Sequence, residues 1–196
     1  MTDDSGRPFQ RPTRGPLSVP VPGLVPGQQV AQITGKGRAM GAGGWEYVTP
    51  YNGSVEESLT ALHRQVFREL YGDDDTYRSI DDLRDDGEFM AEEGTHSILD
   101  VQRVVHSTAA PSPSDIEDYG TLRPPAHDRV LHHFGTDRPT PGRFEELLAQ
   151  AYTAMGRRDP EESLIDECRM RWTGIYVVLH TGDEPTHLGI FGYSGD

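Results

Sequence analysis

The fold of this chain is decided by its last stretch, which reads Trp172-Thr-Gly-Ile-Tyr-Val-Val-Leu-His180, then Thr-Gly-Asp-Glu-Pro, then Thr186-His-Leu-Gly-Ile-Phe-Gly-Tyr-Ser194. Both outer runs are rich in β-branched and aromatic residues, which are typical of strands. The Gly-Asp-Glu-Pro segment between them is typical of a turn. The pattern therefore predicts a β-hairpin that makes the C-terminus part of the sheet of a folded α+β domain.

Further elements are predicted upstream of this hairpin. Residues 45–50 alternate large and polar side chains and indicate a first strand, and residues 95–106 indicate a second. Ser54 and Glu57 form a capping-box pattern before a helix over residues 55–71, whose apolar residues follow helical spacing. Thr140-Pro141 is a second strong helix start. Shorter helices are predicted at 79–94, 127–134 and 159–170, and a long loop at 107–125.

The order of these elements predicts the fold class. At least four strands occur singly and then as a pair, without a regular βαβ alternation. This order favours an α+β fold with a small, largely antiparallel sheet and helices packed on one of its faces.

Composition divides the chain into two parts. Residues 1–44 hold six prolines and nine glycines, which predicts an extended Pro/Gly-rich arm that is mostly disordered. The arm has five basic and two acidic residues, a net charge of +3. Because the whole chain carries −14, residues 45–196 carry −17 and form an acidic α+β domain.

Charge and residue usage exclude several classes of function. A domain of charge −17 repels nucleic-acid phosphates and anionic lipids, so we expect neither nucleic-acid nor membrane binding by the folded body. The single cysteine, Cys168, excludes an internal disulfide and a cysteine-based zinc site. We expect no metal and no cofactor. No secretory signal or membrane-spanning run is visible, which predicts a cytoplasmic protein, and 17 arginines against one lysine suggest a GC-rich bacterial source.

Two polar residues of the predicted second strand are the best catalytic candidates. His96 and Asp100 project from the same face of a strand, but four residues separate them by about 13 Å. They cannot hydrogen-bond each other directly, and each needs a partner from a neighbouring strand, such as Tyr47 or Tyr193. The alternative interpretation is a half-exposed strand whose polar groups are hydrogen-bonded for structural reasons.

Aromatic residues of the first strand and the hairpin are candidates for a binding surface. They gather on elements that we expect to be neighbours, and aromatic side chains often dominate protein interfaces. Packing in the core against the helices is the alternative. The candidate binding residues are Trp45, Tyr47, Trp172, Tyr176 and Tyr193.

Four segments resemble a family of small actinobacterial proteins without an established activity. They are Trp45-Glu-Tyr-Val-Thr-Pro-Tyr51, Glu93-Gly-Thr-His-Ser-Ile-Leu-Asp100, Phe134-Gly-Thr-Asp-Arg-Pro-Thr140 and Phe191-Gly-Tyr-Ser-Gly-Asp196. The resemblance implies no catalytic residue.

Two functional hypotheses follow from the sequence. The first is a non-catalytic protein-binding or regulatory module, whose acidic body engages a basic protein partner such as a toxin or a nucleic-acid enzyme through strand edges and aromatics. The second is a small enzyme with a pocket on the sheet near His96 and Asp100, in which His96 is the general base. The sequence assigns no oligomeric state.

Overall fold

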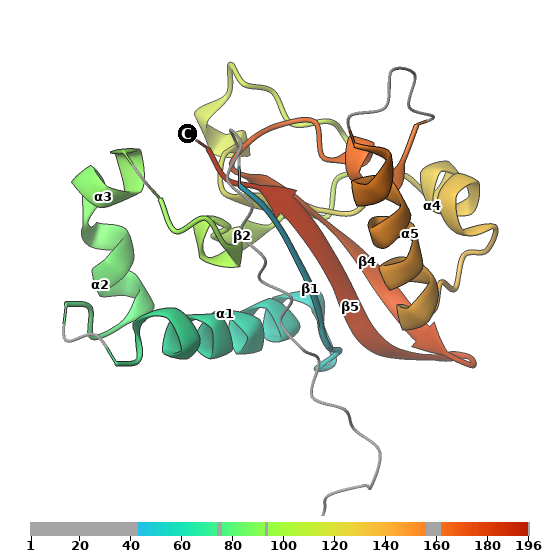
Figure 1. The fold of residues 1–196 in the computed structure, drawn as a ribbon, viewed down its shortest axis with the longest axis horizontal. Helices are drawn as coiled ribbons and strands as arrows, with labels where there is room; N and C mark the ends of the chain where they lie inside the picture. The colour runs from blue at the N-terminus through green and yellow to red at the C-terminus, as the bar shows by residue number, and fades with distance from the viewer. Residues whose placement is uncertain (1–42, 74–75, 93, 156–161, 196) are drawn as a thin grey trace, which may run out of the picture. The chain divides into compact units, whose positions relative to one another are not determined.

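The computed structural model describes residues 43–73, 76–92, 94–155 and 162–195 (Figure 1). The predicted arm therefore lies outside the described residues, except for its last two. The sheet has five strands in the spatial order β1-β5-β4-β3-β2. Their bounds are β1 (Gly44–Pro50), β2 (Arg103–Val104), β3 (Thr121–Arg123), β4 (Thr173–Thr181) and β5 (Glu184–Tyr193).

The α+β class and the minimum of four strands are confirmed, but the prediction of a largely antiparallel sheet is wrong. Strands β1, β5 and β4 pair antiparallel, whereas β3 joins β4, and β2 joins β3, in parallel. Strand β3 lies in the segment 107–125 that was predicted as a loop, and three residues are too few for a periodic pattern. The chain between β3 and β4 contains helices, and such a crossover is what parallel pairing requires.

The predicted hairpin is formed by β4 and β5. Thr181 pairs with Glu184, so the turn is the two-residue segment Gly182-Asp183. Gly182 has φ 63°, in the left-handed region that favours glycine. The signal that decided the fold therefore corresponds to the two longest strands of the sheet.

Helices cover both faces of the sheet, so the prediction of helices on one face is wrong (Figure 1). On one face α1 (Val55–Tyr71) packs with α2 (Ile80–Asp85) and α3 (Gly87–Glu92) beyond it, and on the other lie α4 (His127–Phe134) and α5 (Pro141–Ala154). The physical reason is that β4 and β5 are apolar on both sides: Tyr176 and Ile190 face the α1 layer, whereas Val177 and Phe191 face the α5 layer.

Strand glycines let aromatic rings lie directly on the sheet. Gly174 and Gly192 are cross-strand neighbours, and a Cβ at either would come within 2.6 or 2.4 Å of the Trp45 ring. On the opposite face, a Cβ at Gly189 would come within 2.8 Å of the Phe144 ring of α5. These close approaches hold β1 and α5 against the central strands.

The predicted starts of the two long helices are confirmed. Ser54 caps α1, because its Oγ accepts a hydrogen bond from the Glu57 backbone N–H at 3.1 Å. Thr140 caps α5 and Pro141 occupies its first turn. Residues 156–161, at the start of the predicted helix over 159–170, lie outside the described residues, and the described part holds the short 3₁₀ helix η3 (Leu164–Glu167).

The predicted second strand over residues 95–106 is wrong for most of its length. Only Arg103–Val104 pairs as a strand, and residues 98–100 form the 3₁₀ helix η1 (Ile98–Asp100). Side chains replace the ladder here: the Ser97 hydroxyl accepts from the Leu99 N–H, and the Asp100 carboxylate accepts from the Thr95 N–H. Such local side-chain hydrogen bonds compete with strand pairing.

Candidate functional site

Strand β1 is a long strand at one end of the described sheet, next to β5 in the strand order. Its pairing with β5 is bounded by two hydrogen bonds: the Ser194 N–H donates to the Gly43 carbonyl, and the Tyr51 N–H donates to the Thr186 carbonyl, both at 2.9 Å. Hydrogen-bonded pairs alternate in an antiparallel ladder. The odd-numbered residues of β1 therefore point their backbone groups toward β5.

The even-numbered residues of β1 point their backbone groups away from the sheet. These are Gly44, Glu46 and Val48, followed by Pro50, which has no N–H. No described strand lies beyond β1 in the strand order. Unpaired N–H and C=O groups along such an edge form a ready template for an added strand. At the other side of the sheet, β2 is only two residues long and offers a much shorter edge.

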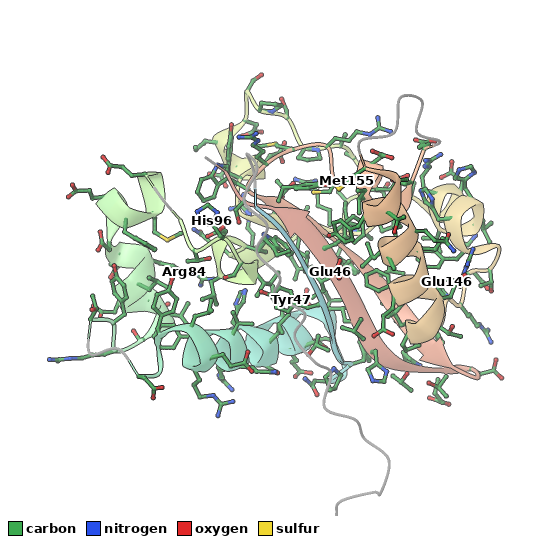
Figure 2. All side chains as sticks on the ribbon, viewed as in Figure 1. Glu46, Tyr47, Arg84, His96, Glu146 and Met155 are labelled. Carbon is green, nitrogen blue, oxygen red and sulfur yellow. The ribbon has the colours of Figure 1, made fainter. Side chains whose placement is uncertain are left out.

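Side chains of β1 alternate between the two layers of helices. Figure 2 shows Tyr47 toward α1 and Glu46 on the side of α5. Trp45 and Tyr47 join the apolar cluster under α1, whereas Val48 packs against the cluster under α5. Glu46 therefore places a carboxylate between the edge of the sheet and α5.

The Glu46 carboxylate is only partly satisfied. Its Oε2 is buried and has no hydrogen-bond partner among the described residues. Burial raises the pKa of this carboxyl, a hydrogen bond from Tyr152 opposes that effect, and the nearby charge of Glu145 raises the pKa further. An unpaired buried oxygen of this kind is costly unless a partner binds it.

Helix α5 supplies the other wall of this site. Glu145 and Tyr152 are two helical turns apart and so lie on the same side of the helix. Burial and the neighbouring Glu46 raise the pKa of the Tyr152 hydroxyl, which keeps it protonated and able to donate. One turn further, Met155, the C-cap of α5, is 54% exposed (Figure 2). We define the edge site as Gly44, Glu46 and Val48 of β1 with Glu145, Tyr152 and Met155.

Asp100, one of the two predicted catalytic residues, is buried and fully engaged. It is 3% exposed. Its Oδ1 accepts from the Thr95 N–H at 2.8 Å and from the Thr95 hydroxyl at 2.7 Å, and its Oδ2 accepts from the Ser194 hydroxyl at 2.5 Å. These bonds join the loop before η1 to the end of β5. The carboxylate thus holds two distant segments together.

His96, the other predicted catalytic residue, is exposed and lies in a different environment (Figure 2). Its backbone has φ 49°, which is uncommon for a residue other than glycine. A Cβ at Gly43 would lie 3.1 Å from its Nδ1, so the imidazole sits over the start of β1. The predicted strand face shared by His96 and Asp100 is absent, because residues 95–97 do not continue a strand.

The predicted aromatic binding set is spread over several environments. Trp45 and Tyr176 are buried in the core, and Tyr47 packs against the same cluster. Tyr193 packs against the cluster on the opposite face. The Trp172 ring contacts the backbone of Gly94 and Gly195.

A carboxylate–imidazole–hydroxyl chain was missed by the sequence reasoning. The His106 Nε2 lies 2.7 Å from the Glu56 Oε1, and its Nδ1 lies 3.3 Å from the Tyr176 hydroxyl. This arrangement resembles a general-base relay in outline. However, burial raises the pKa of the Tyr176 hydroxyl, which disfavours its use as a nucleophile. The only signal in the sequence was the imidazole at residue 106, because Glu56 is 50 residues away.

Within the described ranges, no group of three or more His, Cys, Asp or Glu side chains could hold a metal ion. None of the described helices combines the length and the apolar character that a membrane crossing needs.

Comparison with known proteins gives neither a family nor a function for this chain. No protein-family model matches the chain, and searches of curated proteins and of solved structures find no significant match.

Proposed function

We propose that this chain is a non-catalytic protein-binding module that adds an extended segment of a basic protein partner to the outer edge of β1. The observation that carries the proposal is the row of outward-facing backbone groups at Gly44, Glu46 and Val48. Strand addition supplies affinity through main-chain hydrogen bonds and leaves specificity to the flanking side chains.

Charge supports the choice of a basic partner. Residues 45–196 carry −17, and such a field speeds the association of a basic protein and repels acidic ones. The glutamates at the edge site, Glu46 and Glu145, have the same sign as the whole body.

Binding of a probe peptide tests this function. A fluorescein-labelled eight-residue peptide of alternating arginine and threonine is basic and favours an extended backbone. Fluorescence anisotropy with the full chain should show binding that weakens at least tenfold in Val48→Pro. The Val48 N–H points away from β5, so proline removes an outer donor without removing a bond of the sheet. Val48→Thr, which keeps the N–H, should bind like wild type. Equal binding by Val48→Pro, or no binding at millimolar peptide, would contradict the proposal.

A small enzyme near His96 and Asp100 is the second candidate function. The observation that favours it is the left-handed backbone of His96, whose imidazole lies over Gly43, because strained residues gather at functional sites. Thermal-shift measurements with a panel of nucleotides, sugar phosphates and amino acids should then reveal a compound that stabilises wild type but not His96→Ala. If no compound stabilises wild type more than His96→Ala, this second candidate function is contradicted.

A further inference from the structure

We infer that the edge site selects an arginine of the added segment, and that Glu46 is the residue that recognises it. The inference rests on the proposed function, because it names what the β1 edge binds. The ligand is an extended peptide segment of a partner protein with arginine opposite Glu46.

The position of this arginine follows from strand geometry. Glu46 turns its own N–H and C=O outward, so an added antiparallel strand would form a hydrogen-bonded pair at this residue. Directly opposed residues place their side chains on the same face, with Cβ atoms about 5 Å apart. The residue opposite Glu46 therefore extends along the α5 side of the sheet, toward Glu145 and Tyr152.

The chemistry of the site favours a guanidinium over other groups. The Oε2 of Glu46 is buried and has no partner in the described part of the chain, and Glu145 adds a second negative charge. A guanidinium offers five donors in a planar fork, enough for the Glu46 carboxylate and for the Tyr152 oxygen or Glu145 together. Lysine offers a compact, strongly hydrated charge that matches a half-buried carboxylate less well.

The rest of the site also fits the aliphatic part of an arginine side chain. The three methylene groups of arginine can lie along apolar surface while the head reaches a carboxylate. Val48, on the same face of β1, provides such surface, and Met155, the exposed C-cap of α5, adds apolar surface at the end of that helix. The site therefore combines an apolar rim with an unpaired acidic oxygen.

Three peptides that differ at one position test the inference. Each has the sequence of a threonine-rich extended octamer with arginine, lysine or citrulline at the centre, where citrulline keeps the shape and removes the charge. With the full wild-type chain at pH 7, the arginine peptide should bind at least tenfold more tightly than the citrulline peptide, and lysine should be intermediate. In Glu46→Gln the preference for arginine over citrulline should fall below twofold.

Glu146→Gln is the matched control. Glu146 is the next residue after Glu145 on α5, but it is exposed and bonded to Arg143 and Gln150 (Figure 2). This variant changes the net charge by the same amount as Glu46→Gln and should keep the tenfold preference. A similar loss of preference in both variants would overturn the inference, because it would reflect the general field of the acidic body.

The outcomes separate this inference from the proposed function. Equal affinity for the arginine and citrulline peptides in wild type, with loss of both in Val48→Pro, would overturn the inference and leave the strand-binding function standing. Absence of binding by all three peptides, both to wild type and to a variant in which Lys36 and Arg38 are replaced by glutamine, would overturn both. Binding that appears only after Lys36 and Arg38 are replaced by glutamine would overturn the assignment to a partner, because the chain's own cations would then hold the edge.

Discussion

Two carboxylates of this protein, Asp100 of η1 and Glu46 of β1, have opposite hydrogen-bonding environments. Asp100 accepts three hydrogen bonds, two from Thr95 and one from Ser194. Glu46 has one oxygen that is buried without a partner in the described structure, and burial raises the pKa of its carboxyl. The sequence alone does not distinguish these two acids, but their hydrogen-bond partners in the folded chain do.

This difference suggests how to separate structural from functional acids in the molecule. A carboxylate whose lone pairs are filled by the protein stabilises the fold, and its removal leaves donors unsatisfied. A carboxylate that the protein leaves unsatisfied costs stability and is available to a ligand. The stability of variants at individual acids and at His63 tests this distinction.

Asp100→Ala should give the largest loss of stability. It leaves the Thr95 N–H, the Thr95 hydroxyl and the Ser194 hydroxyl without their acceptor in a buried site. We expect the free energy of unfolding to fall by about 3–5 kcal/mol, measured by urea denaturation followed by circular dichroism. Asp100→Asn should cost less, because its carbonyl still accepts. A loss below about 1 kcal/mol for Asp100→Ala would contradict the structural role.

Acid should destabilise the protein through His63, which lies on the Asp100 side of the sheet. His63 is buried, its Nε2 lies 3.1 Å from the Ile98 carbonyl, and burial together with Arg84 lowers its pKa to about 4. The unfolded chain takes up this proton near pH 6.5, before the folded chain does. Stability is therefore complete above pH 6.5 and should fall by about 3 kcal/mol as the pH decreases to 4.

His63→Gln separates this effect from the titration of the acidic residues. Glutamine can still donate to the Ile98 carbonyl but does not titrate. Urea midpoints of both proteins, measured from pH 7 to pH 4, should show a shallower decrease for the variant. Parallel curves for the two proteins would show that His63 binds as many protons in the folded state as in the unfolded state.

The sequence predicted the elements whose signals are local. The Gly-Asp-Glu-Pro segment between two β-rich runs predicted β4 and β5, and the capping residues Ser54 and Thr140 predicted the starts of α1 and α5. Strand β3 was missed because three residues carry no periodicity. The second layer of helices was missed although Ile175-Tyr-Val-Val-Leu179 is apolar at successive positions, which is the signal of a strand buried on both faces.

The candidate site could be predicted only in part, because its properties depend on long-range order. Neighbouring side chains of a strand lie on opposite faces of the sheet, so the sequence could predict that Glu46 and Tyr47 lie on different faces. Its place on the outer strand of the described sheet could not be predicted, because strand order is a global property. The role of Asp100 was also hidden, since its Ser194 partner is 94 residues away.

Glu46→Gln should stabilise the protein at neutral pH, in contrast to the change at Asp100. Glutamine has the same shape and removes a charge that the fold does not pair. The Glu46 pKa is raised above its ordinary 4.5, so the folded state holds this proton more tightly than the unfolded state does. Wild type therefore loses stability as the pH rises through that raised pKa.

The gain in Glu46→Gln should be near zero at pH 4 and reach about 1 kcal/mol at pH 7, measured by thermal and urea unfolding. Glu146→Gln should change stability by less than about 0.5 kcal/mol at either pH. A loss of stability in Glu46→Gln at pH 7 would place Glu46 with Asp100 as a structural acid and would weaken the edge site.

The smallest effect is expected at Glu56, a carboxylate that is bonded but exposed. Its Oε1 lies 2.7 Å from the His106 Nε2, and the two side chains are 53% and 65% exposed. Water and salt screen such a pair, so a double-mutant cycle of Glu56→Gln and His106→Ala should give a coupling energy below about 0.5 kcal/mol at pH 7, and less in 0.5 M salt. Because Tyr176 also approaches His106, a coupling above about 2 kcal/mol that persists in salt would reveal a desolvated network. The hydrogen bonds to a carboxylate would then fail to distinguish structural from functional acids in this protein. The Glu56–His106–Tyr176 chain would become the better candidate for a catalytic site.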